Sequence, residues 1–204
     1  MKLIFVGPQG CGKGTQAKII SEKMGIAHIS TGDLLRGLSG ELKKEADSFM
    51  LAGKLVPDEF IIKILKQRLM QKDCAKGFIL DGFPRNIAQA KELDKITKID
   101  KVIEIHITDE QAIERVSYRI SCKNCGAVYN EKTNPPKHKG ICDKCNSPIV
   151  KRADDNEEAM KKRLETYHKE TKPILSHYET IKINGQQAID KVTEDISRIL
   201  RSEF

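Results

Sequence analysis

The stretch LIFVGPQGCGKGT, residues 3–15, decides the fold of this chain. A short apolar run at residues 3–6 predicts a strand, and residues 13–24 predict a helix that follows the glycine-rich loop. Glycines let successive backbone N–H groups converge on anionic oxygens, and the positive end of the following helix faces the same oxygens. We therefore predict that residues 10–15 bind phosphate groups and that Lys13 reaches the terminal phosphates.

The loop departs at one position from the common phosphate-loop pattern G-x-x-x-x-G-K-[ST]. Gly14, not a hydroxyl residue, follows Lys13, and Thr15 comes one position later. An ordinary glycine-rich turn is the alternative interpretation. The predicted strand before the loop and the predicted helix after it favour the phosphate-binding interpretation.

Composition and length indicate one globular domain with insertions. The chain has 204 residues, of which 39% are hydrophobic and 32% charged. No apolar run approaches the roughly 18 residues that a membrane-spanning helix needs, and no signal peptide is evident. We therefore expect a cytoplasmic protein.

The net charge of +7 is concentrated in one segment. Between Arg119 and Arg152 there are eight Lys or Arg residues against two acidic ones, Glu131 and Asp143. Such a patch attracts nucleic acid, membrane or a small polyanion, and it also occurs as a solvated surface. Charge alone does not decide between these interpretations.

Short apolar runs alternate with segments of helical periodicity, which predicts a parallel sheet covered by helices, an α/β fold. The predicted strands are residues 3–6, 26–29, 78–80, 102–105 and 181–183. Besides residues 13–24, the predicted helices are 58–71, 109–119, 157–178 and 188–200. We expect Thr31 or Asp33 to cap a further helix, and Asp109 to act as an N-cap.

Two segments do not fit this alternation, and we predict that they are insertions. Residues 30–59 are rich in helix formers but contain no further strand, and residues 119–154 contain cysteine pairs and a proline-rich turn. The remaining residues, 1–29, 60–118 and 155–204, are then the core.

Four cysteines in the second insertion predict a zinc site. Cys122 and Cys125 form one C-x-x-C pair and Cys142 and Cys145 another, with sixteen residues between the pairs. This spacing is typical of a zinc ribbon, in which four thiolates complete a closed, structural site. Disulfides and a redox pair are the alternatives, and an intracellular setting disfavours the former. Cys11 and Cys74 lie outside the pattern and are interpreted as buried or incidental thiols.

Further polar residues follow the predicted strand at residues 78–80. Asp81 comes directly after it, where open α/β sheets bind their ligands, and it is suited to hold magnesium through water. Arg85 offers a bidentate fork for phosphate. Four more arginines flank the two insertions: Arg36, Arg119, Arg152 and Arg163.

Taken in chain order, these motifs resemble those of the adenylate kinases, in the long bacterial type with a zinc-binding lid. They are G-P-Q-G-C-G-K-G-T, S-T-G-D-L-L-R, G-K-L-V-P-D, D-G-F-P-R followed by Gln89, and R-A-D-D-N before Arg163. The resemblance covers essentially the whole chain. It implies the P-loop nucleoside-monophosphate kinase fold, with residues 30–59 as the helical NMP-binding domain and residues 119–154 as a zinc-ribbon lid.

The same resemblance implies reversible, magnesium-dependent transfer of a phosphoryl group from ATP to AMP, giving two ADP and maintaining the adenine nucleotide balance. The residues implied for ATP are Gly10, Cys11, Gly12, Lys13, Gly14, Thr15, Arg119, Val128, Tyr129 and Gln187. Those implied for AMP are Thr31, Arg36, Lys54, Leu55, Val56, Gly82, Phe83, Pro84, Arg85, Gln89, Arg152 and Arg163. The implied catalytic residues are Lys13, Arg85, Arg119, Arg152 and Arg163, which act by positioning and charge neutralisation.

Two other functions remain open. In the first, the protein is a related kinase whose acceptor is UMP, CMP or GMP. Thr31 and Gln89 favour AMP instead, because a glutamine amide both donates to and accepts from an adenine edge. Alternatively, the basic ribbon binds nucleic acid and the glycine loop serves a nucleotide switch. Few aromatic residues are available for base stacking, so we expect no nucleic-acid partner. Without a long apolar run we expect no membrane partner, and without an evident oligomerisation element we expect a monomer.

Three positions differ from what the family leads us to expect. Gln9 and Cys11 stand where small residues or proline are common, and Tyr118 precedes Arg119 where glycine is frequent. The glycines of the loop, Lys13 and Thr15 are intact, so the prediction of phosphate binding holds.

Overall fold

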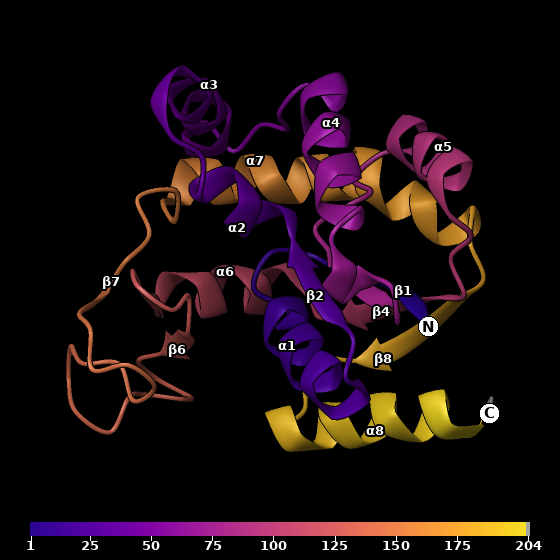
Figure 1. Ribbon diagram of the computed structural model, residues 1–204. Helices are drawn as coiled ribbons and strands as arrows, with labels where there is room; N and C mark the ends of the chain where they lie inside the picture. Colours follow the sequence, from indigo (N-terminus) through magenta and orange to yellow (C-terminus); the bar gives the residue numbers. More distant parts are fainter. Residues whose placement is uncertain (203–204) are drawn as a thin grey trace.

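A five-stranded parallel sheet forms the centre of the molecule in the computed structural model, which describes residues 1–202 (Figure 1). The strand order is β2-β3-β1-β4-β8. The strands are β1 (Lys2–Val6), β2 (Ala27–Ser30), β3 (Phe78–Asp81), β4 (Lys101–His106) and β8 (Thr180–Asn184). Each predicted strand is present and each neighbouring pair is parallel, so the predicted α/β fold is confirmed.

Both faces of this sheet are buried, because successive side chains of a strand point to opposite faces. In β1, Leu3 and Phe5 join one hydrophobic core and Ile4 and Val6 join the other. Helices α1 (Lys13–Met24) and α8 (Ile189–Ser202) contribute to the first core, and α4 (Asp58–Leu69) and α5 (Ile87–Ile96) to the second. Figure 1 shows the two pairs of helices on opposite sides of the sheet.

The helix caps differ from two predictions. Helix α2 (Thr31–Arg36) is capped by Ser30, whose hydroxyl accepts from the backbone N–H of Asp33 at 3.2 Å, so the prediction of Thr31 or Asp33 is wrong. Helix α6 (Asp109–Ser117) is capped by Thr108 in a capping box, so the prediction of Asp109 is also wrong. An N-cap needs an extended backbone one residue before the helix, and sequence alone placed it one or more residues too late.

The long helix predicted over residues 157–178 is interrupted. Helix α7 spans Glu157–Thr166, and a π-helical segment η2 (Tyr167–Thr171) and a 3₁₀ segment η3 (Lys172–Ser176) continue it. Pro173 has no N–H and its ring crowds the preceding turn, which prevents a regular α-helix there. The other predicted helices are confirmed, and none of their ends is shifted by more than two residues.

The two predicted insertions have distinct local structures. Residues 30–59 contain the last residue of β2, then α2, α3 (Gly40–Leu51) and the start of α4. Residues 119–154, which we call the ribbon, hold a three-stranded antiparallel sheet of β5 (Arg119–Cys122), β6 (Val128–Asn130) and β7 (Ile149–Val150). The ribbon has a small core of its own and lies to the left of the main sheet in Figure 1. Across residues 1–202, no helix combines the length and apolar character needed to cross a membrane.

Candidate active site

The loop of residues 7–15, which we call the phosphate loop, has a backbone that only glycines adopt readily. Gly10 and Gly12 have φ values of 85° and 92°, and a side chain on Gly10 would come within 2.9 Å of the Ala112 carbonyl. Gly12 precedes α1 without any side-chain cap, which leaves the first N–H groups of the helix available to an anion. The Lys13 ammonium bends back to donate to the carbonyl of Pro8 at 3.1 Å. This backbone geometry fits the predicted phosphate cradle, and phosphate binding itself stays a prediction.

Asp81 explains why glycine follows Lys13 in this chain. A Cβ atom on Gly14 would lie 3.0 Å from Asp81 Oδ2, so a larger residue would push against the carboxylate. Burial by itself raises the pKa of Asp81, but His28, whose Nε2 lies 3.5 Å from Asp81 Oδ2, and the nearby charge of Lys13 outweigh it and hold this pKa below its usual value. An ionised carboxylate therefore faces the start of α1, as a water-mediated magnesium ligand requires.

The turn after β3 holds Arg85 in a desolvated position. Its Nε donates to the carbonyl of Gly82 at 2.7 Å, and Thr31 Oγ1 donates to the same carbonyl at 2.9 Å. Burial lowers the pKa of Arg85, and the nearby positive charge of Arg163 lowers it further. A half-buried guanidinium that is repelled by a neighbouring cation is suited to bind a polyanion.

The side-chain amide of Gln89 is held by hydrogen bonds to two partners. Its carboxamide oxygen accepts from the backbone N–H of Arg85 at 2.7 Å, and its nitrogen donates to Asp58 Oδ1 at 2.7 Å. Asn86 Nδ2 donates to the same carboxylate at 3.1 Å. Gln89 is buried, and its amide orientation is fixed by a residue, Asp58, to which the sequence pointed only as a helix start.

Two consecutive aspartates neutralise the arginines beside the ribbon. Arg119 makes a bidentate pair with Asp155, with Nε 2.7 Å from Oδ2 and a second contact between Nη2 and Oδ1. Arg163 Nη2 donates to Asp154 Oδ2 at 2.6 Å and to the carbonyl of Met50 at 3.1 Å. The R-A-D-D-N motif contained both carboxylates, but their roles as counterions were missed. The signal available was that buried arginines need paired charges.

Arg152 and Arg36 complete the group of predicted arginines. Arg152 Nε donates to Ser121 Oγ at 3.2 Å, and burial followed by repulsion from Arg119 lowers the pKa of Arg152 to about 10. Arg36 pairs with Asp33 of its own helix at 2.6 Å. Repulsion between these cations in the absence of a ligand predisposes this region to bind phosphate groups.

A cleft brings several predicted residues together. It lies between the phosphate loop, the turn after β3 and α7. The predicted residues that line it are Lys13, Leu55, Gly82, Pro84, Arg85 and Arg163. Residues that the sequence did not predict as site residues also line it, namely Phe5, Val6, Gly7, Gln9, Gly53, Thr166, Tyr167 and Thr171. The Tyr167 hydroxyl is buried without a hydrogen-bond partner, and Thr171 Oγ1 donates to the carbonyl of Arg85 at 2.8 Å.

Other predicted residues lie outside this cleft. Phe83 and Val56 are buried in the second core, and Lys54 is exposed. Tyr129 packs inside the ribbon, where its hydroxyl lies 3.4 Å from Cys142 Sγ, while its neighbour Val128 is exposed. Gln187 donates to the carbonyl of Asn184 and to Asp195 Oδ2 at 3.0 and 2.9 Å. The structure therefore leaves the nucleotide contacts of these residues as predictions.

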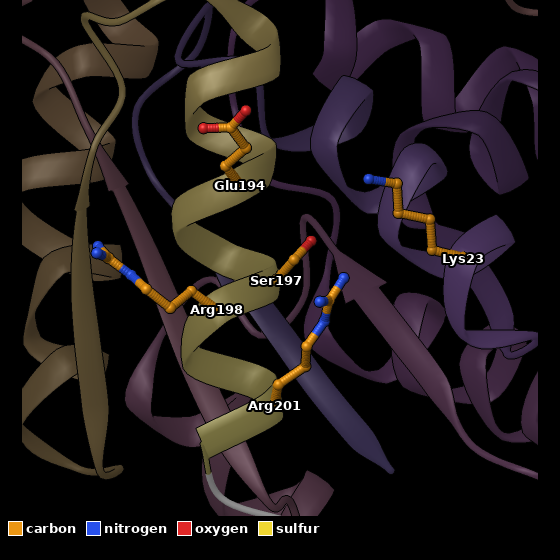
Figure 2. Close-up of a pocket in the computed structure, with 5 residues that line it drawn as sticks. All are labelled: Lys23, Glu194, Ser197, Arg198 and Arg201. Atoms are coloured by element: carbon orange, nitrogen blue, oxygen red, sulfur yellow. The ribbon is translucent and has the colours of Figure 1, made fainter.

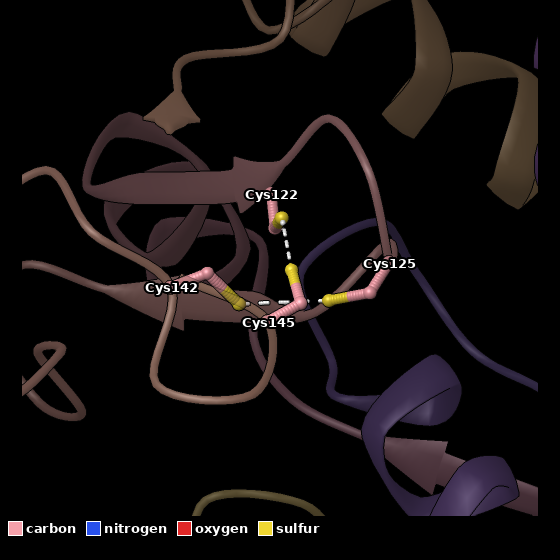
Figure 3. Close-up of side chains that lie close together, drawn as sticks. All are labelled: Cys122, Cys125, Cys142 and Cys145. Atoms are coloured by element: carbon pink, nitrogen blue, oxygen red, sulfur yellow. Dashed lines mark hydrogen bonds between the residues drawn. The ribbon is translucent and has the colours of Figure 1, made fainter. Parts of the chain in front are cut away.

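The four ribbon cysteines form a cluster that fits zinc (Figure 3). Their sulfur atoms all lie within 4.8 Å of one another, with 3.5 Å between Cys122 and Cys145 and between Cys125 and Cys142. Tetrahedral zinc with Zn–S bonds of about 2.3 Å places sulfur atoms about 3.8 Å apart. The Ser147 hydroxyl and then its backbone N–H lower the pKa of Cys145 to about 5. For Cys125, a backbone hydrogen bond from Ala127 lowers the pKa, but burial and the neighbouring thiols outweigh it and raise this pKa to about 11.

The two remaining cysteines lie elsewhere and are buried. Burial raises the pKa of the Cys11 thiol, and Cys74 lies 3.0 Å from Arg68 Nη1. All six cysteines fall within residues 1–202, and all are free thiols. The predicted division into four ligands and two incidental thiols agrees with this arrangement.

A second hollow lies between α1 and α8 (Figure 2). Its lining residues are Lys23, Glu194, Ser197, Arg198 and Arg201. Lys23 is ten residues from Lys13, which places this groove roughly 15 Å along the α1 axis from the phosphate loop. It is separate from the cleft, and we assign it no part in the site.

Comparison with known sequences agrees with this geometry. The family described as adenylate kinase matches residues 5–183. The adenylate kinase of Caldicellulosiruptor saccharolyticus is 47% identical, and the alignment covers all of both chains. The adenylate kinase of Archaeoglobus fulgidus is also 47% identical, over 98% of each chain, and that of Clostridioides difficile is 46% identical over 99% of each. The protein with this phosphate loop, arginine-lined cleft and cysteine cluster therefore belongs to the adenylate kinase family.

Proposed function

We propose that this protein transfers a phosphoryl group reversibly from ATP to AMP, giving two ADP, with magnesium as the cofactor of ATP. One observation carries the proposal. Residues of the glycine phosphate loop, including its lysine, line the same cleft as two half-buried arginines, Arg85 and Arg163. Two clustered nucleotides that exchange a phosphoryl group need this arrangement, since positioning and charge neutralisation supply most of the catalysis.

The proposed binding sites follow the family motifs. On the ATP side we place Gly10, Cys11, Gly12, Lys13, Gly14, Thr15, Arg119, Val128, Tyr129 and Gln187. On the AMP side we place Thr31, Arg36, Lys54, Leu55, Val56, Gly82, Phe83, Pro84, Arg85 and Gln89, with Arg152 and Arg163 reaching toward the transferred group. The bonds to Arg85 and Asp58 fix the orientation of the Gln89 amide, which the family motif assigns to the acceptor side.

The arginines act electrostatically in this proposal. Arg85 and Arg152 are half-buried beside other cations, and desolvation, followed by repulsion from those cations, lowers their pKa values. Charge that develops on the transferred phosphoryl group is stabilised by donors that are already fixed in place. No side chain has to act as a general base.

Asp81 is the residue that we propose for magnesium, through water. Its carboxylate is ionised and adjoins Gly14, where the phosphate loop ends and α1 begins. Bound magnesium neutralises phosphate charge and orients the leaving group.

We propose that residues 119–154 act as a lid and residues 30–59 as an AMP-binding domain, both moving on the core of residues 1–29, 60–118 and 155–204. Closure excludes water, which would otherwise hydrolyse ATP. The ribbon has only a small core, so zinc on its four cysteines stabilises its fold and lets it move as one body. Reduced thiol ligands suit the cytosol, where we expect the protein to act as a monomer.

A coupled assay of ADP formation tests the proposal. MgATP is offered with AMP, UMP, CMP or GMP in turn, with magnesium chelation and acceptor-free ATP as controls. We expect turnover with AMP alone and a loss of at least about 100-fold in Arg85→Ala. Arg198→Ala, a change of a largely exposed arginine outside the cleft, is the matched control and should keep full activity.

Two outcomes would contradict the proposal in different ways. Turnover with another monophosphate would refute the choice of acceptor while leaving the reaction class. Absence of AMP-dependent turnover, together with salt-sensitive binding of DNA or RNA, would instead support the nucleic-acid interpretation of the ribbon.

A further inference from the structure

Gln9 occupies a position of the phosphate loop where the family commonly has a small residue or proline. Its side chain is half-buried and lines the cleft beside Lys13. With the carboxamide oxygen facing Arg119, that oxygen accepts from Nη2 at 2.7 Å and from Nη1 at 3.1 Å. A side chain of the phosphate loop thus holds the arginine that begins the ribbon.

Arg119 is restrained from two sides as a result. Its Nε and Nη2 groups pair with Asp155, whose side chain is fully buried and lies 3.6 Å from Arg163 Nη1. The Gln9 oxygen, in the phosphate loop, accepts hydrogen bonds from the other edge of the guanidinium, formed by Nη1 and Nη2. Only 11% of the Arg119 side chain is exposed, so little of it is free to move into water. A planar guanidinium bound along two edges has one orientation left.

Asp155 alone does not restrain the guanidinium to this extent. A single carboxylate fixes the Nε and Nη2 edge but leaves Nη1 without a protein partner, whereas the Gln9 oxygen accepts from both terminal nitrogens. Alanine or proline at position 9 has no side-chain acceptor to offer Arg119. The contact is therefore a feature of this chain's own residue at position 9.

We propose that Gln9 is a positioning residue, which holds Arg119 over the phosphate loop before ATP binds. The inference rests on the proposed function, in which Arg119 contacts the ATP phosphates. Preorganised donors contribute most to the chemical step, because they need no reorganisation while charge develops. Loss of the Gln9 oxygen should therefore lower kcat more than it changes the KM for MgATP.

Gln9→Met tests this, because methionine has similar length and no carboxamide acceptor. We expect kcat to fall about tenfold while the KM for MgATP changes less than about twofold. The kcat of Gln9→Ala, which places a small residue in the loop, should fall by a similar factor. Gln71→Met alters an exposed glutamine outside the cleft and is the matched control, with unchanged kinetics. Melting temperatures of all variants should match the wild type, which separates positioning from a loss of folding.

A mutant cycle with Arg119→Lys identifies the partner. Lysine lacks the guanidinium fork, so Gln9→Met should change kcat by less than about twofold in that background. The inference is overturned if Gln9→Met keeps the wild-type kcat, or if it lowers kcat equally with arginine or lysine at position 119.

A second measurement keeps the inference separate from the proposed function. Nuclear magnetic resonance of the Arg119 guanidinium in the nucleotide-free protein reports rotation about its Nε–Cζ bond. We expect faster rotation in Gln9→Met than in the wild type, and equal rates would refute the inference. A wild-type protein without AMP-dependent turnover would refute the proposed function, and the rotation rates would still decide whether Gln9 holds Arg119.

Discussion

Asp155→Asn should destabilise the nucleotide-free protein strongly, because this carboxylate is the shared counterion of two buried arginines. It pairs with Arg119 through two contacts and lies 3.6 Å from Arg163 Nη1, and its side chain has no exposed surface. The Arg119 and Arg163 side chains are only 11% and 14% exposed. Neutralising the carboxylate leaves their positive charge without its closest partner.

The magnitude follows from the type of pair. Removal of one partner from a buried ion pair costs about 3–5 kcal/mol, and asparagine keeps one oxygen as an acceptor, so we expect a loss of about 3 kcal/mol in the free energy of unfolding. For a protein of this size, 1 kcal/mol corresponds to about 2–4 °C. The melting temperature should therefore fall by about 6–12 °C.

Thermal unfolding, followed by circular dichroism, measures this fall with and without nucleotides. With ATP, AMP and magnesium present, phosphate groups at Arg119 and Arg163 should supply part of the missing negative charge and reduce the fall to about half. Asp73→Asn is the matched control, since Asp73 also binds an arginine, Arg68, through two hydrogen bonds but is 54% exposed.

We expect the melting temperature of the control to stay close to that of the wild type, because exposed ion pairs contribute little. An Asp155→Asn protein that melts within 2 °C of the wild type would refute the reasoning about shared counterions. An equal fall with and without nucleotides would refute the placement of phosphates beside the two arginines.

Other parts of the structure make further predictions. For Asp154, burial raises the pKa but Arg163 outweighs it and lowers the pKa. Its ionised form therefore stabilises the fold above the unfolded pKa of about 4, and this contribution is lost as pH falls through the lower folded pKa. In urea titrations from pH 8 to 3, the stability difference between wild type and Asp154→Asn should stay constant above pH 5 and shrink below pH 4. Gly14→Ser places its Cβ 3.0 Å from Asp81 Oδ2, so kcat/KM for MgATP should fall at least about tenfold, and full activity would contradict the proposed contact. Tyr167→Phe removes a buried hydroxyl without a partner, so unfolding should cost about 1 kcal/mol more, and a clear loss of stability would show that the hydroxyl has a partner. Removal of zinc by a chelator should increase proteolysis within residues 119–154 but not in the main sheet, and unchanged protection would refute a structural metal.

The sequence by itself determined the main architecture and the nature of the site. The apolar runs predicted each strand of the main sheet, because a strand buried on both faces must be apolar along its length. The phosphate loop and the cysteine pairs could also be recognised from the sequence, since their chemistry depends on residues close together in the chain. The family resemblance found in these motifs is confirmed by relatives that match the whole chain.

Only the tertiary structure decided how the charged and polar groups are paired. Arg119 and Asp155 are 36 residues apart, and Gln89 and Asp58 are 31 apart, so no local pattern indicated either pair. The contact between Gln9 and Arg119 joins the phosphate loop to the ribbon across more than half the chain. A buried polar group must find a partner, but many side chains of the right chemistry are available along a sequence. Folding selects among them by bringing one within hydrogen-bonding distance, and that choice is visible only in three dimensions.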